Sequence, residues 1–348
     1  MLYVGLDLSR KRLDWLALGE EGQPAGIGAA PPDRAGLARL GRRLDDRPVL
    51  AVIESMSGAR FVHDQLEQAG WDVRIADAAK ARGLAPLACK SDRIDCWVLA
   101  ELARRNLVPE IWLPDPAVRA ERERARLRLH LVKHRRSLKN RVHAILFQHG
   151  LPNAYRDLFD AGGRCLLGRV ELEEPWASTV RASLALVDRL DDQIGECERE
   201  LRRLGAEHRY VPLLTTLPGI AWVLGYTIAS EIGDIGRFPS PRKLVGYTGL
   251  TPRVEQSGER DRRGRLRKNG PNYLRWALIE AAHTAGRDPR FRPIVERMRE
   301  RHGRKRGSKI AAIEIGRRLS EAIWHMLRKD EPFAPAGTPT PLAAGRPT

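Results

Sequence analysis

The sequence predicts an α/β unit at the N-terminus, followed by long helices and a mainly helical C-terminal part. Three observations support this prediction. Short apolar runs alternate with helical patterns before residue 112, and residues 117–149 contain neither glycine nor proline. Beyond residue 206, helical patterns are joined through Pro-Gly turns. A chain of 348 residues is long enough for several such parts.

The α/β unit opens with two strand-like runs, Leu2–Ser9 and Arg12–Gly19, which a short polar turn joins into a predicted hairpin. Residues 47–55 form a continuous apolar run, which is typical of a strand covered on both faces. A helical segment over residues 58–70 ends at a glycine, and residues 71–77 form another predicted strand.

A helix that begins near Asp92 closes this unit, and its two aspartates allow two interpretations. In "SDRID", Asp92 at the cap and Asp95 three residues later form an ordinary helix start. Positions three apart also share one helix face, so both carboxylates could contact one metal ion. The second interpretation requires further acids at the same place.

Two strand residues could supply those acids. Asp7 lies among the apolar residues of the first strand, where an ionised carboxylate needs a partner or a metal. Glu54 ends the strand at residues 47–55, at the edge where α/β sheets place their sites. Four converging carboxylates would repel one another, and two Mg²⁺ or Mn²⁺ ions would relieve the repulsion and clamp a phosphodiester.

Two long helices are predicted in the middle of the chain. Their apolar residues recur at steps of three, four or seven: Leu127, Leu131, Leu138, Val142 and Ile145 within 117–149, and Val187, Leu190, Ile194, Cys197, Leu201 and Leu204 within 176–204. Such seams pair either as a hairpin within one chain or as an intermolecular coiled coil, and the sequence leaves both open.

The balance of charge favours a polyanionic partner. The chain carries 61 Lys and Arg against 44 Asp and Glu, a formal net charge of +17, and nucleic acid is the first candidate for such a protein. The alternative is a surface of solvated arginines. The first long helix concentrates basic residues, and Arg135, Arg136 and Lys139 are candidate contacts to nucleic acid.

Other classes of protein are not indicated. The four cysteines show neither a CxxC pair nor a His cluster, so neither a disulfide framework nor a zinc site is predicted. The charged N-terminus is unlike a signal peptide, and about eighteen consecutive apolar residues occur nowhere. We therefore expect a cytoplasmic protein that does not associate with a membrane.

The third section begins near Val211. The turn "LPGI" at 217–220 is either a phosphate-binding helix-hairpin-helix turn or a plain packed turn. Pro271 stands at a predicted first helical position, and the helix continues to Ala285. The Pro-rich tail from residue 331 is predicted to be disordered.

Taken together, these motifs resemble a known family. An Asp in the first strand, a Glu after a later strand and "SDRID" at a helix start are similar to the DEDD-motif transposases of the insertion-sequence one-hundred-and-ten family. The segments "EIGDIGRF", "LVGYTGLTPRVEQSG" and "GRLRKNGPNYLR" resemble that family's C-terminal domain. The resemblance implies a RuvC-like, RNase H-like domain at 1–112, a coiled-coil region at 113–205, a transposase domain at 206–330 and a tail at 331–348.

The resemblance also implies roles for single residues. Asp7, Glu54, Asp92 and Asp95 match the metal-binding acids, and Ser257 in "EQSGER" matches a serine nucleophile, although a Ser-Gly in a polar loop is by itself an ordinary turn. The basic residues expected to hold nucleic acid near this serine are Arg253, Arg263, Arg265, Arg267, Lys268 and Arg275.

As a family member, the protein would recombine DNA under the direction of a structured guide RNA, as a dimer or tetramer. Two alternatives remain open from the residues alone. One is a metal-dependent nuclease or junction resolvase that uses water in place of Ser257. The other is a non-catalytic nucleic-acid-binding protein.

Overall fold

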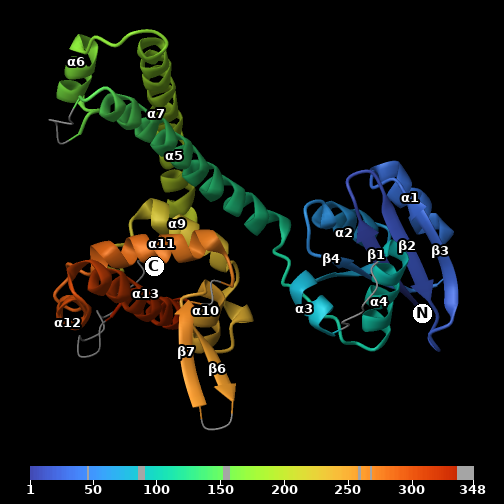
Figure 1. The fold of residues 1–348 in the computed structure, drawn as a ribbon. Coiled ribbons are helices and arrows are strands. Elements are labelled where there is room, and N and C mark those ends of the chain that lie inside the picture. Colours follow the sequence, from blue (N-terminus) through green and yellow to red (C-terminus); the bar gives the residue numbers. More distant parts are fainter. Residues whose placement is uncertain (45–46, 85–90, 152–156, 258–259, 267–268, 335–348) are drawn as a thin grey trace, which may run out of the picture. The chain divides into compact units, whose positions relative to one another are not determined.

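The computed structural model describes residues 1–44, 47–84, 91–151, 157–257, 260–266 and 269–334. The chain divides into two compact units, Met1–Leu113 and Pro114–Thr348 (Figure 1). The first is α/β, and the second is mostly helical, as the sequence predicts. Within the described ranges, no helix is both long and apolar enough to cross a membrane.

A five-stranded sheet forms the centre of the first unit. Its strands are β1 (Leu2–Leu8), β2 (Leu13–Leu18), β3 (Pro24–Ala30), β4 (Val49–Glu54) and β5 (Asp72–Ala76). They lie in the order β3-β2-β1-β4-β5, with β1, β2 and β3 antiparallel and with β4 and β5 parallel to β1. The predicted hairpin and the two later strands are confirmed.

Helices cover both faces of this sheet. They are α1 (Arg34–Arg43), α2 (Ala59–Gln68), α3 (Ala78–Leu84) and α4 (Asp92–Arg104). Side chains alternate along β1, so Leu2, Val4 and Leu6 share a core with α1 and α2. The other face of the sheet packs against α4. The residues of β1 that point to the α4 side are therefore Tyr3, Gly5 and Asp7.

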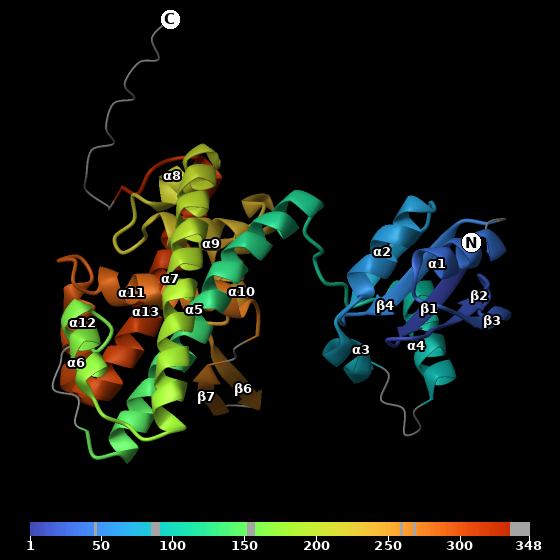
Figure 2. The same ribbon diagram turned by 90° about the horizontal axis from the view of Figure 1, so that it is seen from above.

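The second unit begins with a hairpin of two long helices, α5 (Pro116–Gln148) and α7 (Trp176–Glu207), with the short α6 (Ala161–Arg169) between them in the chain. In both views α5 and α7 run side by side within the one chain (Figures 1 and 2). The buried residues of α7 include Val180, Val187, Ile194 and Leu201, one in every seven. Such a repeat keeps one apolar stripe facing the partner helix.

The predicted seam of α5 is wrong in its first half. Leu127 is 47 % exposed, whereas Ala125 and Leu129 are buried. The N-terminal half of α5 packs against α9 (Trp222–Ile232) as well as α7, so a different stripe turns inward. The small side chain of Ala125 allows this close packing, whereas the second half of the seam, at Val142 and Ile145, is buried as predicted.

A buried carboxylate ties α5 to α9. Glu231 is fully buried, and Arg126 donates to both of its oxygens, Nε to Oε1 at 2.8 Å and Nη2 to Oε2 at 3.0 Å. Arg122 donates to the backbone carbonyls of Ser230 and Glu231, at 2.8 and 2.7 Å. The carboxylate is thus neutralised by a bidentate pair, which is the arrangement that a buried charge requires.

The rest of the second unit is a helical core that carries one β-hairpin. Its elements are α8 (Val211–Leu214), α9, a 3₁₀ turn (Ile235–Arg237), α10 (Pro241–Thr248), β6 (Pro252–Ser257), β7 (Arg260–Leu266), α11 (Asn272–Ala285), α12 (Arg292–His302) and α13 (Arg304–Lys329). Pro271 is the N-cap of α11, in an extended conformation, so the helix begins at Asn272, one position after the predicted start at Pro271. The predicted tail lies outside the described residues from 335 on.

The "LPGI" turn packs between helices. Leu217 and Ile220 are buried, and Gly219 has a φ of +82°. A Cβ at Gly219 would lie 2.3 Å from the carbonyl oxygen of Ala281 on α11, so only glycine allows this close approach. The geometry accounts for the turn as a packing element.

Candidate active site

Asp7 and Glu54 lie at the same edge of the sheet. The parallel register pairs Leu6 of β1 with Ile53 of β4, so Asp7 and Glu54 follow at the next position on adjacent strands. Both side chains are half-buried. Because β1 and β4 are parallel, their carboxyl ends meet where α/β sheets commonly bind ligands.

A glycine brings α4 onto this edge. The Cβ that any other residue would carry at position 5 would lie 1.8 Å from the carbonyl oxygen of Cys96. Gly5 therefore lets the backbone of α4 rest directly on β1, two residues before Asp7. The Cys96 thiol is buried in this contact, and burial, followed by the charge of Asp7, raises its pKa to about 12.

The first turn of α4 carries Asp92 and Asp95. The N-cap is Ser91, whose Oγ accepts a hydrogen bond from the Ile94 N–H at 3.3 Å. The expectation that Asp92 itself caps the helix is therefore wrong, because the serine already fills that position. Neither aspartate is needed as a cap, and both sit in the first turn, where the helix dipole favours negative charge.

The electrostatics of Asp7 connect the four acids. Burial raises its pKa above the usual value, and the charges of Asp92, Asp95, Glu54 and Asp14 raise it further, in that order. Charges act on a carboxyl most strongly when they are close to it, so Asp92, Asp95 and Glu54 lie near enough to Asp7 for their charges to raise its pKa.

This location suits a hard divalent cation by its chemistry, since all of its donors are carboxylate oxygens. As they are placed, however, no three His, Cys, Asp or Glu side chains of the described ranges are arranged to hold one ion together. Carboxylates repel one another when no cation neutralises them. A bound cation would remove this repulsion and allow the carboxylates to move closer together around it.

The sequence reasoning missed Asp14 as a neighbour of Asp7. The antiparallel register places Asp14 on β2 directly opposite Asp7. The Arg12 guanidinium donates hydrogen bonds to the Asp14 carboxylate at 2.7–2.9 Å. Arg12 and Asp14, together with Ser91 and Asp92, line a hollow of about 390 Å³. The predicted hairpin was the available signal, because its short turn sets which residues of the two strands face each other.

Ser257 lies in the second unit, at the end of β6. Its backbone pairs with Arg260 at the start of β7, so Ser257 is the last residue of a strand rather than a loop residue. Its side chain lies outside what the structure describes. The acids belong to the first unit and the serine to the second.

The predicted basic contacts around the serine are only partly described. Arg253 lies on β6, and Arg263 and Arg265 lie on β7, with their backbones alone described. Arg267 and Lys268 lie outside the described residues. Arg275, on α11, is held by the Thr248 carbonyl at 3.4 Å and by Asn272, and burial lowers its pKa.

Much of the basic charge on α5 is neutralised within the chain. Three of its arginines pair with acids of α7: Arg124 with Glu200, Arg128 with Glu198, and Arg135 with Asp191. Of the predicted nucleic-acid contacts, Lys139 lies over the Phe159 ring at 4.5 Å, and Arg136 is exposed, with no acidic partner in the described part of the chain. The composition of α5 alone did not reveal that acids of α7 form ion pairs with these arginines.

Two family models match the chain. One, described as "Transposase IS116/IS110/IS902 family", matches residues 211–296. The other, a transposase model for the DEDD transposases of IS110, matches residues 4–150. Both regions of the candidate site, the acids and the serine hairpin, lie within these matches.

Individual relatives agree. The chain is 25% identical to the transposase for insertion sequence element IS1328 of Yersinia enterocolitica, over 80% of this chain and 83% of that protein. It is 31% identical to the y4qE protein of Sinorhizobium fredii, over 58% of this chain but only 50% of the relative's length. It is also 33% identical to the pilin gene-inverting protein of Moraxella bovis, over 42% of this chain and 45% of that protein.

Proposed function

Because this chain belongs to the IS116/IS110/IS902 family of transposases and is an enzyme of DNA recombination, we propose that it cleaves and rejoins DNA through a serine nucleophile and a divalent metal ion. The observation that supports this proposal is the parallel register of β1 and β4, which sets Asp7 and Glu54 at the next positions of adjacent strands. The raised pKa of Asp7, to which burial and the charges of Asp92, Asp95 and Glu54 contribute, agrees with it. Such a set is unfavourable without a cation and suited to binding one or two.

The four acids would hold Mg²⁺ or Mn²⁺ through their carboxylate oxygens. When bound, the metal would stabilise the negative charge that develops on a phosphodiester. The fold of this chain would position these acids. The pairing of β1 and β4 holds Asp7 and Glu54 on adjacent strands, and the contact at Gly5 holds the first part of α4 against β1.

Ser257 would supply the attacking oxygen. Its hydroxyl would lose a proton and form a bond to phosphorus, while the bond to the 3′ oxygen breaks and that oxygen takes up a proton. A 5′-phosphoserine linkage would result, and the reverse reaction with another 3′ hydroxyl would rejoin the strand. No His lies between residues 250 and 270 to act as the base, so activation would come from the metal site.

The finer features of the family are part of the proposal. The sheet order β3-β2-β1-β4-β5, with acids on β1 and β4 and on a following helix, supports a RuvC-like, RNase H-like first domain. The heptad spacing of α7 supports a coiled-coil role for the long helices. The formal charge of +17 and the exposed Arg136 support binding of a structured guide RNA as well as DNA.

Ser257→Ala tests the nucleophile. With a DNA substrate labelled at the expected cleavage site, the variant should lose both strand cleavage and the covalent adduct, by several orders of magnitude, while DNA binding persists. Ser137→Ala, an exposed serine on α5, is the matched control and should retain full activity.

A different result would favour the other enzyme class. If Ser257→Ala cleaves normally and leaves no adduct, water is the nucleophile and the protein is a metal-dependent nuclease. If Asp7→Ala also cleaves normally, the metal-dependent mechanism itself is wrong.

A further inference from the structure

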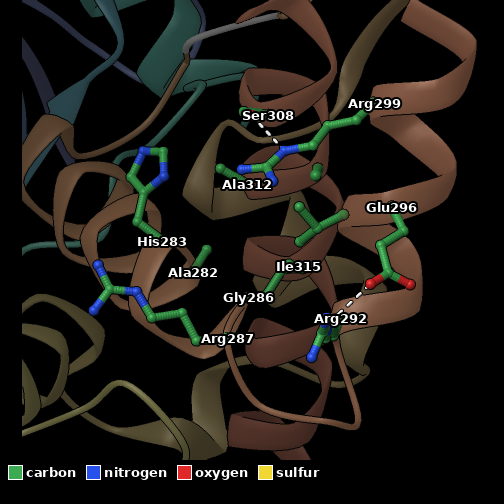
Figure 3. A pocket seen from close by; sticks show the side chains of 12 residues that line it. Ala282, His283, Gly286, Arg287, Arg292, Glu296, Arg299, Ser308, Ala312 and Ile315 are labelled. Carbon is green, nitrogen blue, oxygen red and sulfur yellow. Dashed lines mark hydrogen bonds and ion pairs between the residues drawn. The ribbon is translucent and has the colours of Figure 1, made fainter. Parts of the chain in front are cut away.

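Outside the acids and the serine hairpin, a hollow of the second unit lies between α11, α12 and α13 (Figure 3). Its volume is about 550 Å³, which falls within the range of small-molecule sites. No step of the proposed cleavage uses it.

The floor of the hollow is apolar. Ala282 on α11 and Ala312 and Ile315 on α13 are buried beneath it. Gly286 also lines it, and a Cβ there would lie 3.1 Å from Val295 Cγ2 and 3.5 Å from Ile315 Cδ1, so only a glycine lets these side chains pack so closely. The floor therefore offers an apolar surface to a bound group.

The rim of the hollow is basic. Arg292 pairs with Glu296 at 2.8 Å, whereas Arg299 donates to the Ser308 hydroxyl at 2.9 Å. Arg287, on the opposite wall, has no acidic partner within the described ranges. Figure 3 shows His283 and Arg299 reaching over the hollow from opposite sides. Three cations face one acid at this opening, so the rim favours an anion.

The basic rim continues over the neighbouring surface. The exposed cations of this surface are Arg297, Arg301, Arg304, Lys305, Arg306 and Lys309. Over residues 297–309 the single acid is Glu300, so solvation by mixed charges does not explain the composition. The family match ends at residue 296, so this surface lies beyond it.

We propose that the hollow seats one unpaired nucleotide of a single strand, with its base on the apolar floor and its phosphate at Arg299 and Arg287. Stacking and apolar contact would hold the base, and the basic surface of α12 and α13 would hold the phosphates on either side. A base that is paired in a duplex cannot enter the hollow. The site would act in strand binding and is separate from the acids and from Ser257.

The test measures binding in EDTA, so that cleavage plays no part. The probes are a 12-nucleotide oligothymidylate, the matching oligouridylate and an abasic 12-mer of equal charge. The unmodified protein should bind a probe with bases about tenfold more tightly than the abasic probe. Ala312→Phe fills the floor and should remove that preference while leaving the affinity for the abasic probe unchanged.

Arg299→Gln provides a second variant that leaves the floor intact. It should weaken binding of all single-stranded probes and lower the salt dependence of that binding by about 0.7 in the log–log slope, with duplex binding retained. The matched control is Arg328→Gln, an exposed arginine in the last turn of α13 and outside the hollow and the basic surface, which should leave the slope unchanged.

The outcomes separate this site from the cleavage mechanism. A loss of preference with either the DNA or the RNA probe supports the site and identifies the sugar. If Ala312→Phe keeps the full preference for bases, or if Arg299→Gln lowers duplex binding as much as single-strand binding, the proposal is wrong. Ser257→Ala should bind every probe like the unmodified protein, whatever its effect on cleavage.

Discussion

Asp7 occupies the α4-covered face of β1, where both burial and neighbouring carboxylates act against its ionised form. An apolar residue would be expected at this position of a covered strand, and the neighbouring Leu6 and Leu8 of β1 are indeed buried apolar residues. The charges of Asp92, Asp95 and Glu54, which raise the pKa of Asp7, also reduce the stability of the metal-free protein when Asp7 is ionised. Such local cost is typical of functional sites.

This cost can be measured with Asp7→Asn. Because the folded-state pKa of Asp7 is raised above 3.8, the folded protein binds this proton more tightly than the unfolded chain does. The destabilisation is absent well below pH 3.8 and grows as the pH rises through the folded-state pKa. In EDTA at pH 7, Asp7→Asn should therefore raise the Tm by a few degrees, and the gain should vanish in acid.

Two controls accompany this measurement. Glu21→Gln removes an exposed acid from the turn after β2 and should leave the Tm unchanged at both pH values. Added Mg²⁺ should raise the Tm of the unmodified protein more than that of Asp7→Asn. An equal Mg²⁺ effect on both proteins would mean that Asp7 does not face the ion.

At the scale of elements, the helices and strands with periodic apolar residues could be predicted from the sequence, and those without such a pattern could not. The hairpin of β1 and β2 and the long helix α7 follow from the spacing of their apolar residues. β3 escaped prediction because "PAGIGAA" combines proline, glycine and alanine, which are poor strand formers; Gly26 and Gly28 instead leave room for the Trp15 ring.

The sequence pointed to the acids of the candidate site but not to the contacts that hold their elements together. Asp7 stands out as a charged residue within an apolar strand, Glu54 as the acid that ends one, and Asp92 and Asp95 as acids at a helix start. The contact of Gly5 with Cys96 was not visible, because it joins residues far apart in the sequence. The pairing of Arg126 with Glu231 was hidden for the same reason.

The link between α5 and α9 leads to a prediction about stability. Glu231→Ala would leave Arg126 and Arg122 without the carboxylate that neutralises them and should cost about 3–5 kcal/mol in the free energy of unfolding. The matched control is Glu200→Ala, which breaks an exposed pair with Arg124 (3.3 Å) and should cost about 0–1 kcal/mol. Urea denaturation measures both, and equal losses would show that Glu231 is not a critical link.

At the scale of the whole molecule, the two halves of the proposed chemistry belong to separate units. The acids lie within Met1–Leu113 and Ser257 within Pro114–Thr348. A long α5 of 33 residues follows directly after the unit boundary. Separate units connected through one chain allow a site to be assembled from two protomers of a multimer, as the family resemblance implies.

Complementation tests this arrangement. Asp7→Ala and Ser257→Ala should each be inactive alone, whereas a mixture should recover partial recombination, because some assemblies would contain one intact pair of halves. The double variant Asp7→Ala, Ser257→Ala, mixed with either single variant, is the control and should stay inactive. A mixture that assembles by size but shows no activity would mean that the acids and the serine of one chain act together.

The contact between Gly5 and the Cys96 carbonyl also bears on how the gene can drift. Every amino acid reached from a glycine codon by one base change carries a β-carbon, and at position 5 that atom would collide with the backbone of α4. Any missense mutation in this codon should therefore push the helix of Asp92 and Asp95 away from Asp7. Gly83, with nothing within 4 Å of its Cβ position, can drift to alanine freely. Copies of the gene that remain under selection should show the difference, with glycine kept at codon 5 and alanine tolerated at codon 83.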